Sequence, residues 1–73
     1  MTPAQCRAAR ALLDWTQPQL ADASKLGLST VVDFEKQRRA VSEEAQSAIR
    51  TALELAGIEL INHTGVRVGV PPK

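Results

Sequence analysis

The sequence predicts a mainly α-helical fold, in which four helices are followed by a short β-hairpin at the C-terminal end. Two observations predict it. Apolar residues recur at intervals of three or four through four segments, and each segment begins just after a residue type that caps helices. Near residue 58 the apolar period changes to two, which is typical of strands. With 73 residues, 44% of them hydrophobic, the chain has room for one folded domain.

The first helix is expected over residues 3–14. Thr2 is a suitable N-cap, Pro3 fits the first turn, and Gln5 completes a capping box with Thr2. Cys6, Ala9 and Leu13 recur at helical spacing along it, with Leu12 beside them.

A second helix is expected over residues 17–24, after an interruption at Trp15. Thr16 and Gln19 form another capping box, and Pro18 is tolerated because a first-turn amide has no helical acceptor. The residues expected to be buried are Leu20 and Ala21, with Ala23 as a third candidate.

The third helix is expected over residues 28–37, following a break at 24–27. Gly27 is the residue of that break best suited to unusual backbone angles or to a compact cap. The β-branched run 30–32 favours a strand locally, but the apolar spacing around it is helical. The predicted buried side holds Leu26, Val31 and Phe34, and the outward side holds Ser29, Val32, Asp33 and Lys36.

The fourth helix is expected to begin after Ser42 as N-cap and to end near Gly57. Glu43 and Glu44 lie at its positively polarised start. Its inner face is expected to comprise Ala45, Ala48, Ile49, Ala52, Leu53 and Ala56. Beyond it, residues 58–61 and 66–68 are expected to pair as strands around a loop at 62–65, and residues 70–73 to fray.

Several classes of protein are excluded by composition. The single cysteine, Cys6, cannot form an internal disulfide, which argues for a reducing compartment. No apolar run approaches the roughly 18 residues of a membrane span, and Arg7, Arg10 and Asp14 stand where a signal peptide is apolar. We therefore expect a cytoplasmic protein that has no membrane partner.

No catalytic constellation is recognisable. His63 lies in the predicted loop, apart from any cluster of acids or cysteines, and is expected to be a solvated turn residue. Glu43 and Glu44 are adjacent on a helix and do not face each other. No phosphate-binding glycine loop or zinc-binding spacing is present, so we expect neither an enzyme nor a bound metal or cofactor.

One stretch of the chain has a pattern of residues that is more informative than its composition. The segment Gln17-Pro18-Gln19-Leu20-Ala21 is followed by a turn and then by Ser29-Thr30-Val31-Val32-Asp33-Phe34-Glu35-Lys36-Gln37-Arg38-Arg39. This pattern resembles the phage repressor and Cro family of helix-turn-helix transcriptional regulators (XRE type), without gaps over residues 5–57. The chain departs from the family where it has Lys25 and Gln37 in place of glycine and Gly27 in place of a Ser or Thr cap. A left-handed Lys25 would cost on the order of 1 kcal/mol.

The resemblance implies a four-helix repressor-like domain that places helix 28–37 in the major groove of DNA. It implies base contacts from Leu28, Ser29, Thr30 and Asp33, and phosphate contacts from Gln17, Lys36, Arg38 and Arg39. An alternative stays open for each of two residues. Leu28 could instead pack against the turn, and Asp33 could instead support a neighbouring basic side chain. The resemblance also implies a structural ion pair between Arg10 and Glu35.

The expected partner is a palindromic double-stranded DNA operator, bound by a homodimer. A two-stranded hairpin is marginal alone and exposes an edge, so we expect residues 58–73 to be the dimerisation element beside a DNA-binding domain at 1–57. Such pairing would place two recognition helices roughly 34 Å apart. The alternative is a protein-interaction module of the same fold, such as an antitoxin or anti-activator, which the net charge of only +1 and the apolar Leu28 and Val32 favour.

Overall fold

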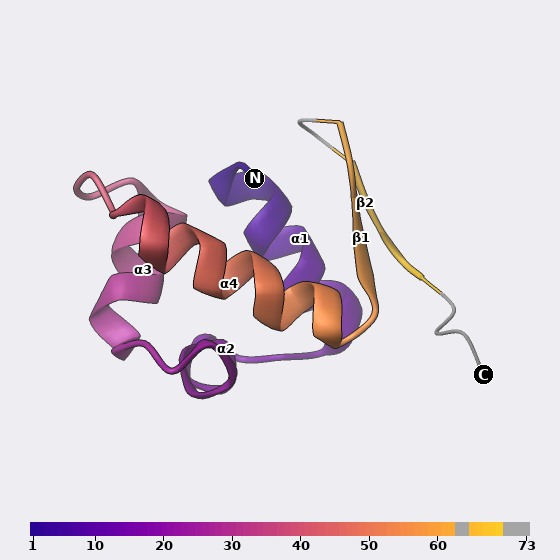
Figure 1. The fold of residues 1–73 in the computed structure, drawn as a ribbon, viewed down its shortest axis with the longest axis horizontal. Coiled ribbons are helices and arrows are strands. Elements are labelled where there is room, and N and C mark those ends of the chain that lie inside the picture. Colours follow the sequence, from indigo (N-terminus) through magenta and orange to yellow (C-terminus); the bar gives the residue numbers. More distant parts are fainter. Residues whose placement is uncertain (63–64, 70–73) are drawn as a thin grey trace.

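The computed structural model describes residues 1–62 and 65–69 and confirms the predicted fold class (Figure 1). The predicted loop residue His63 and the predicted frayed end at 70–73 lie outside the described residues. The elements follow in the order α1 (Pro3–Leu13), α2 (Gln17–Ser24), α3 (Leu28–Lys36), α4 (Glu43–Leu55), β1 (Ile58–Ile61) and β2 (Gly65–Val68). Figure 1 shows α3 at one end of the molecule and the hairpin at the other, with α1 and α4 between them.

The helix starts follow the predicted capping chemistry. The Thr2 hydroxyl accepts a hydrogen bond from the Gln5 backbone N–H, and the Gln5 side chain accepts one from the Thr2 N–H. Thr16 and Gln19 repeat this reciprocal pair at the start of α2. Gly27 caps α3 without a side-chain hydrogen bond.

Three helices end on a non-glycine residue in the left-handed region. Asp14, Lys25 and Gln37 have φ values of 57°, 60° and 55° and cap α1, α2 and α3. The first and third helices therefore end one residue earlier than predicted, because their last predicted residue turns the chain out of the helix. Within the break after α2, Lys25 rather than Gly27 adopts the unusual angle, since Gly27 is extended with φ of −69°.

The core is built around Leu20, Ile49 and Leu53, which are the largest fully buried apolar side chains. Two polar residues at its margin are buried where the sequence did not indicate it. On α2 the third buried residue is Ser24, whose hydroxyl donates to the Leu20 carbonyl, whereas Ala23 is exposed. On α1 Leu12 is exposed, and the buried neighbours of Cys6 and Ala9 include Gln5.

The hairpin is packed against the helices. Ile58 is buried in the same core, and Leu60 and Val66, which pair across the strands, pack against it. The Gln5 side-chain amide donates to the carbonyls of Asn62 and Gly65, at 3.1 Å each, and so ties both strand ends of the turn to α1. β2 begins at Gly65, one residue earlier than predicted. Within the described ranges, the structure contains no helix of sufficient length and apolarity to span a bilayer.

Candidate nucleic-acid interface

α2 and α3 form a helix-turn-helix unit whose turn is closed by backbone hydrogen bonds. Leu26 N–H donates to the Ala21 carbonyl at 2.9 Å, which folds the chain back directly after the left-handed Lys25. Val31 and Phe34 are buried on the inner side of α3. The inner side of α3 is thereby fixed to the core, and its other side faces outward.

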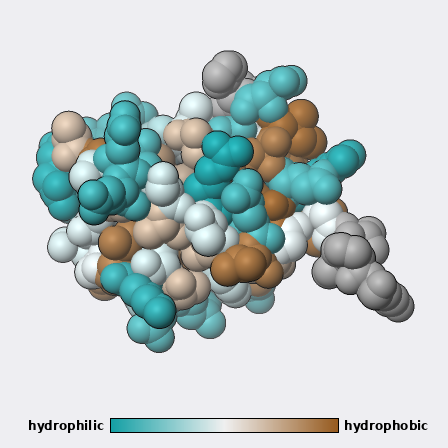
Figure 2. Space-filling view, viewed as in Figure 1, coloured by the Kyte–Doolittle hydropathy of each residue, from teal (hydrophilic) through white to brown (hydrophobic). Residues whose placement is uncertain are grey.

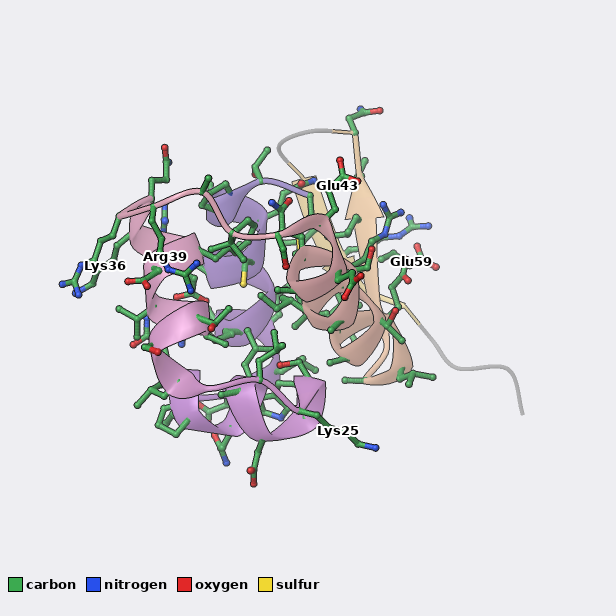
Figure 3. The ribbon with its side chains drawn as sticks, turned by 60° about the vertical axis from the view of Figure 1, so that its left-hand side comes forward. Lys25, Lys36, Arg39, Glu43 and Glu59 are labelled. Atoms are coloured by element: carbon green, nitrogen blue, oxygen red, sulfur yellow. The ribbon has the colours of Figure 1, made fainter. Side chains whose placement is uncertain are left out.

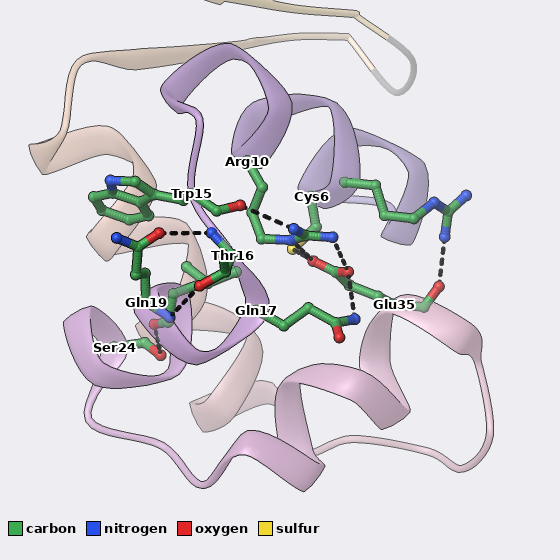
Figure 4. A network of polar contacts seen from close by, with 10 residues as sticks. Cys6, Arg10, Trp15, Thr16, Gln17, Gln19, Ser24 and Glu35 are labelled. Atoms are coloured by element: carbon green, nitrogen blue, oxygen red, sulfur yellow. Dashed lines mark hydrogen bonds and ion pairs between the residues drawn. The ribbon is translucent and has the colours of Figure 1, made fainter.

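A buried ion pair attaches α3 to α1. Arg10 makes a bidentate contact with Glu35, with Nε 2.6 Å from Oε2 and Nη2 2.7 Å from Oε1 (Figure 4). The Glu35 side chain is only 1% exposed. The remaining Arg10 nitrogen, Nη1, donates to the Trp15 carbonyl at 3.0 Å. The structure therefore contains the ion pair that the sequence resemblance implied.

Two further side chains complete the Glu35 site. Gln17 Nε2 donates to Glu35 Oε1 at 3.0 Å, and the Cys6 thiol donates to Oε2 at 3.1 Å (Figure 4). Arg7 Nη1 donates to the backbone carbonyl of Glu35 at the end of α3. The sequence did not indicate these roles, because they depend on the crossing of α1, α2 and α3. The helical spacing of Arg7 and Arg10 is the one signal that could have placed both on the same face.

The contacts at Glu35 perturb three pKa values, and the pKa of the Arg10 guanidinium is raised, mainly by its hydrogen bond to Glu35. Burial raises the pKa of the Glu35 carboxyl, but the hydrogen bonds from Arg10, Gln17 and Cys6 outweigh burial, and the pKa is lowered. Burial, the hydrogen bond to Glu35 and the negative charge of Glu35 all raise the pKa of the Cys6 thiol. Glu35 is therefore ionised and Cys6 is a protonated donor at neutral pH, which makes the thiol a poor nucleophile.

The predicted base-contacting residues lie on the outer side of α3. Leu28 is 46% exposed, so it does not belong to the core, and Ser29 is also exposed. Thr30 and Asp33 are half-buried. These side chains are contributed by the first two turns of the helix, which are the turns that can reach base edges in a major groove.

Basic side chains gather at the end of α3 and in the loop after it. Lys36, Arg38 and Arg39 are all exposed, and hydrophilic side chains cover this end of the molecule in Figure 2. Lys36 extends away from the helix, whereas Arg39 lies back against it (Figure 3). Three exposed cations therefore lie within four residues of one another at the end of α3 and directly after it.

Two of the residues predicted to contact DNA form an ion pair with each other. Arg39 Nε lies 2.8 Å from Asp33 Oδ2 in an ion pair. The alternative in which Asp33 supports a basic neighbour is therefore the arrangement in the structure. Gln17, predicted to contact a phosphate, instead directs its amide to Glu35.

Among residues 1–62 and 65–69, no three His, Cys, Asp or Glu side chains are grouped to hold a metal ion. No protein-family model matches the chain, and a search of curated proteins finds no significant match. The resemblance of residues 5–57 to the phage repressor and Cro family stays a prediction.

Proposed function

We propose that this chain is a sequence-specific DNA-binding transcriptional regulator, acting as a repressor, that places α3 in the major groove of an operator. A single observation carries the proposal: α3 is fixed from behind by the buried Glu35 network, and its first turn presents exposed Leu28 and Ser29 on the outer side. A rigid helix with exposed Leu28 and Ser29 can present the same atoms to every base pair that it meets, which sequence recognition requires.

The charge distribution supports the same function. The net charge is only +1, but Lys36, Arg38 and Arg39 lie together at the end of α3. Neutralising phosphates beside the helix supplies affinity, and the helix itself supplies specificity. Such a regulator would act in the cytoplasm as a homodimer on a palindromic site, with the hairpin as the dimerisation element.

The test is selection of duplexes from a random DNA pool, followed by affinity measurements across a range of salt concentrations. We expect an enriched palindrome whose affinity falls steeply as salt rises. Replacing Lys36 and Arg38 by alanine should lower the affinity for every duplex and flatten the salt dependence by about one unit of slope for each phosphate interaction removed. Arg50→Ala, which removes an exposed cation on α4, is the control and should leave the slope unchanged. Failure to enrich any duplex at low salt would contradict the proposal.

A second candidate is a protein-interaction module of the same fold, acting as an antitoxin or anti-activator. Its supporting observation is Leu28, an apolar side chain 46% exposed at the start of α3. Recovery of a protein partner, together with no duplex affinity at low salt, would favour this candidate. Substituting Leu28 by Ala should then weaken the protein complex.

A further inference from the structure

The outer side of α3 carries a guanidinium that does not belong to the helix. Arg39 follows α3 in the chain, yet its side chain lies back over the helix (Figure 3). Its Nε donates to Asp33 Oδ2 at 2.8 Å, and its Nη2 makes a longer contact of 3.5 Å with Thr30 Oγ1. Thr30 and Asp33 are three positions apart and therefore lie on the same face of the helix. Arg39 thus covers the middle of the predicted base-reading surface.

We propose that Arg39 reads a guanine in the operator and that Asp33 is the residue that positions it. The inference rests on the proposed function and names the base that one of its side chains recognises. It replaces the separate roles expected from the resemblance, in which Asp33 contacts a base and Arg39 a phosphate.

The donors left on Arg39 suit guanine. A guanidinium has five N–H bonds. Three have partners in the described part of the chain: Nε on Asp33, Nη2 on Thr30, and Nη1 at 3.4 Å from the Ala40 carbonyl. One N–H remains on each terminal nitrogen. A pair of donors on the two terminal nitrogens can bind O6 and N7 of guanine, which is the commonest specific contact in the major groove.

Exposure also favours Arg39 as the reading residue. The side chain of Arg39 is 52% exposed and that of Asp33 only 20%, so an approaching duplex meets the guanidinium first. A carboxylate facing DNA alone would be repelled by the phosphates, and its pairing with Arg39 removes that repulsion. The pairing also fixes a long side chain in one orientation, which lowers the entropy lost when it binds a base.

Lys36 provides the contrast. It lies on the last turn of α3 and extends away from the helix, with no ion pair to the described residues (Figure 3). A flexible ammonium in that place suits a phosphate, whose recognition does not depend on base identity. Lys36→Ala is therefore the matched variant for a cation that supplies affinity alone.

The test is duplex selection and affinity measurement on the full chain and its variants Arg39→Lys, Arg39→Ala, Asp33→Ala and Lys36→Ala. We expect the wild-type chain to require guanine at one position of each half-site. Arg39→Lys keeps the charge but loses the planar fork, so the preference for guanine should fall about 10-fold or more. Asp33→Ala should reduce the same preference, whereas Lys36→Ala should leave the preference intact and reduce the salt slope by about 1.

A double-variant comparison separates the role of Asp33 from direct reading. When Arg39 is already alanine, Asp33→Ala should change base preference no further, since Asp33 acts through Arg39. A change at a different base pair would show that Asp33 reads DNA itself and would overturn the inference. Thermal unfolding of each variant, followed by circular dichroism, confirms that the compared chains are folded.

Two other outcomes are decisive. If operators are selected but Arg39→Lys keeps the guanine preference, and Arg39→Ala lowers the salt slope as Lys36→Ala does, then Arg39 is a phosphate contact and the inference alone fails. If the wild-type chain selects no duplex, the proposed function fails, and the inference fails with it.

Discussion

Glu35 receives hydrogen bonds from two other helices. Its carboxylate is buried on α3 and accepts from Arg10 and Cys6 on α1 and from Gln17 on α2. Removing an ion from water costs several kcal/mol, and only good geometry with further hydrogen bonds offsets that cost. The attachment of α3 to α1 and α2 therefore depends on all of these donors together.

Removing the cation from this site should be strongly destabilising. Arg10→Met leaves the Glu35 charge buried without its main partner, so we expect the free energy of unfolding to fall by about 3–5 kcal/mol. Urea denaturation followed by circular dichroism measures it. The control is Arg50→Met, which breaks an exposed pair with Glu54 and should cost about 0.5 kcal/mol or less. Similar losses in the two variants would show that burial of the Arg10–Glu35 pair has no energetic consequence.

The same site predicts a pH dependence of stability. The pKa of Glu35 is lower in the folded chain than its unfolded value of about 4.3, so the stabilisation is complete above that pH and is lost as the pH falls through the folded pKa. Unfolding temperatures measured from neutral pH downward should therefore decline below about pH 4.3. Glu35→Gln should show a flatter decline, whereas Glu54→Gln, at an exposed position, should follow the wild type. A decline that is identical in all three chains would exclude Glu35 as its source.

The helices begin and end by different means. Thr2 and Thr16 start α1 and α2 with capping boxes that satisfy backbone donors. Asp14, Lys25 and Gln37 end helices in the left-handed region, where a side chain with a Cβ is strained. The backbone is therefore strained at the ends of these helices and not at their starts, and Lys25 lies at such an end within the helix-turn-helix unit.

Relieving that strain should stabilise the fold. Lys25→Gly places a residue without Cβ at φ of 60°, so we expect the free energy of unfolding to rise by about 1 kcal/mol. Lys25→Ala keeps the Cβ and is the matched control, for which no comparable gain is expected. An equal gain from alanine would locate the effect in the lysine side chain rather than in the backbone. Chemical denaturation of the three chains gives the comparison.

At the scale of the molecule, the packing of the hairpin against the helices must be separated from its proposed role in dimerisation. Ile58 belongs to the core and Gln5 holds the turn, so deletion of the hairpin would expose the core and leave a buried amide without acceptors. Loss of dimers after such a deletion would not distinguish unfolding from the removal of an interface. Exposed hairpin positions are the better probe, and Val68, 53% exposed, is one of them. Apolar side chains are visible on the hairpin surface in Figure 2.

Val68→Glu should dissociate a dimer formed through the hairpin, because each copy would bring a buried charge to the contact. Light scattering over a range of concentrations should show the mass of a dimer for the wild-type chain and of a monomer for the variant. Leu55→Glu makes the same change on α4, at a side chain 85% exposed, and should leave the mass unchanged. A wild-type chain that scatters as a monomer throughout, or a Val68→Glu variant that stays dimeric, would contradict the hairpin interface.

The molecule is 37 Å long, and α3 and the hairpin lie at its opposite ends (Figure 1). A dimer formed through the hairpin would therefore have its two α3 helices at the far ends. A separation of about 34 Å, one turn of DNA, then requires the protomers to be steeply inclined to each other, and an end-to-end arrangement requires a larger multiple of the turn. The half-site spacing in selected operators reports which arrangement is formed.

Local signals in the sequence were sufficient to predict the helices and strands. Capping residues and apolar periods located the four helices and two strands of the described residues to within one or two residues at each end. The errors concern two polar residues that are buried: the Ser24 hydroxyl is satisfied by a carbonyl of its own helix, and the Gln5 amide is satisfied by the hairpin turn. Of the candidate site, the outward side of α3 and the ion pair were predictable, but the pairing of Asp33 with Arg39 was not.

The amino-acid order by itself determined where each helix begins, which side of each helix is apolar, and that a hairpin closes the chain, because these properties depend on neighbours within about one helical turn. Beyond the capping boxes and the Arg10–Glu35 pair, only the tertiary structure decided which polar side chains meet. The other partners of Glu35 come from positions 6 and 17, and the guanidinium over α3 comes from a loop that folds back on it. Such contacts are set by helix crossings and loop paths, which depend on how the whole core packs.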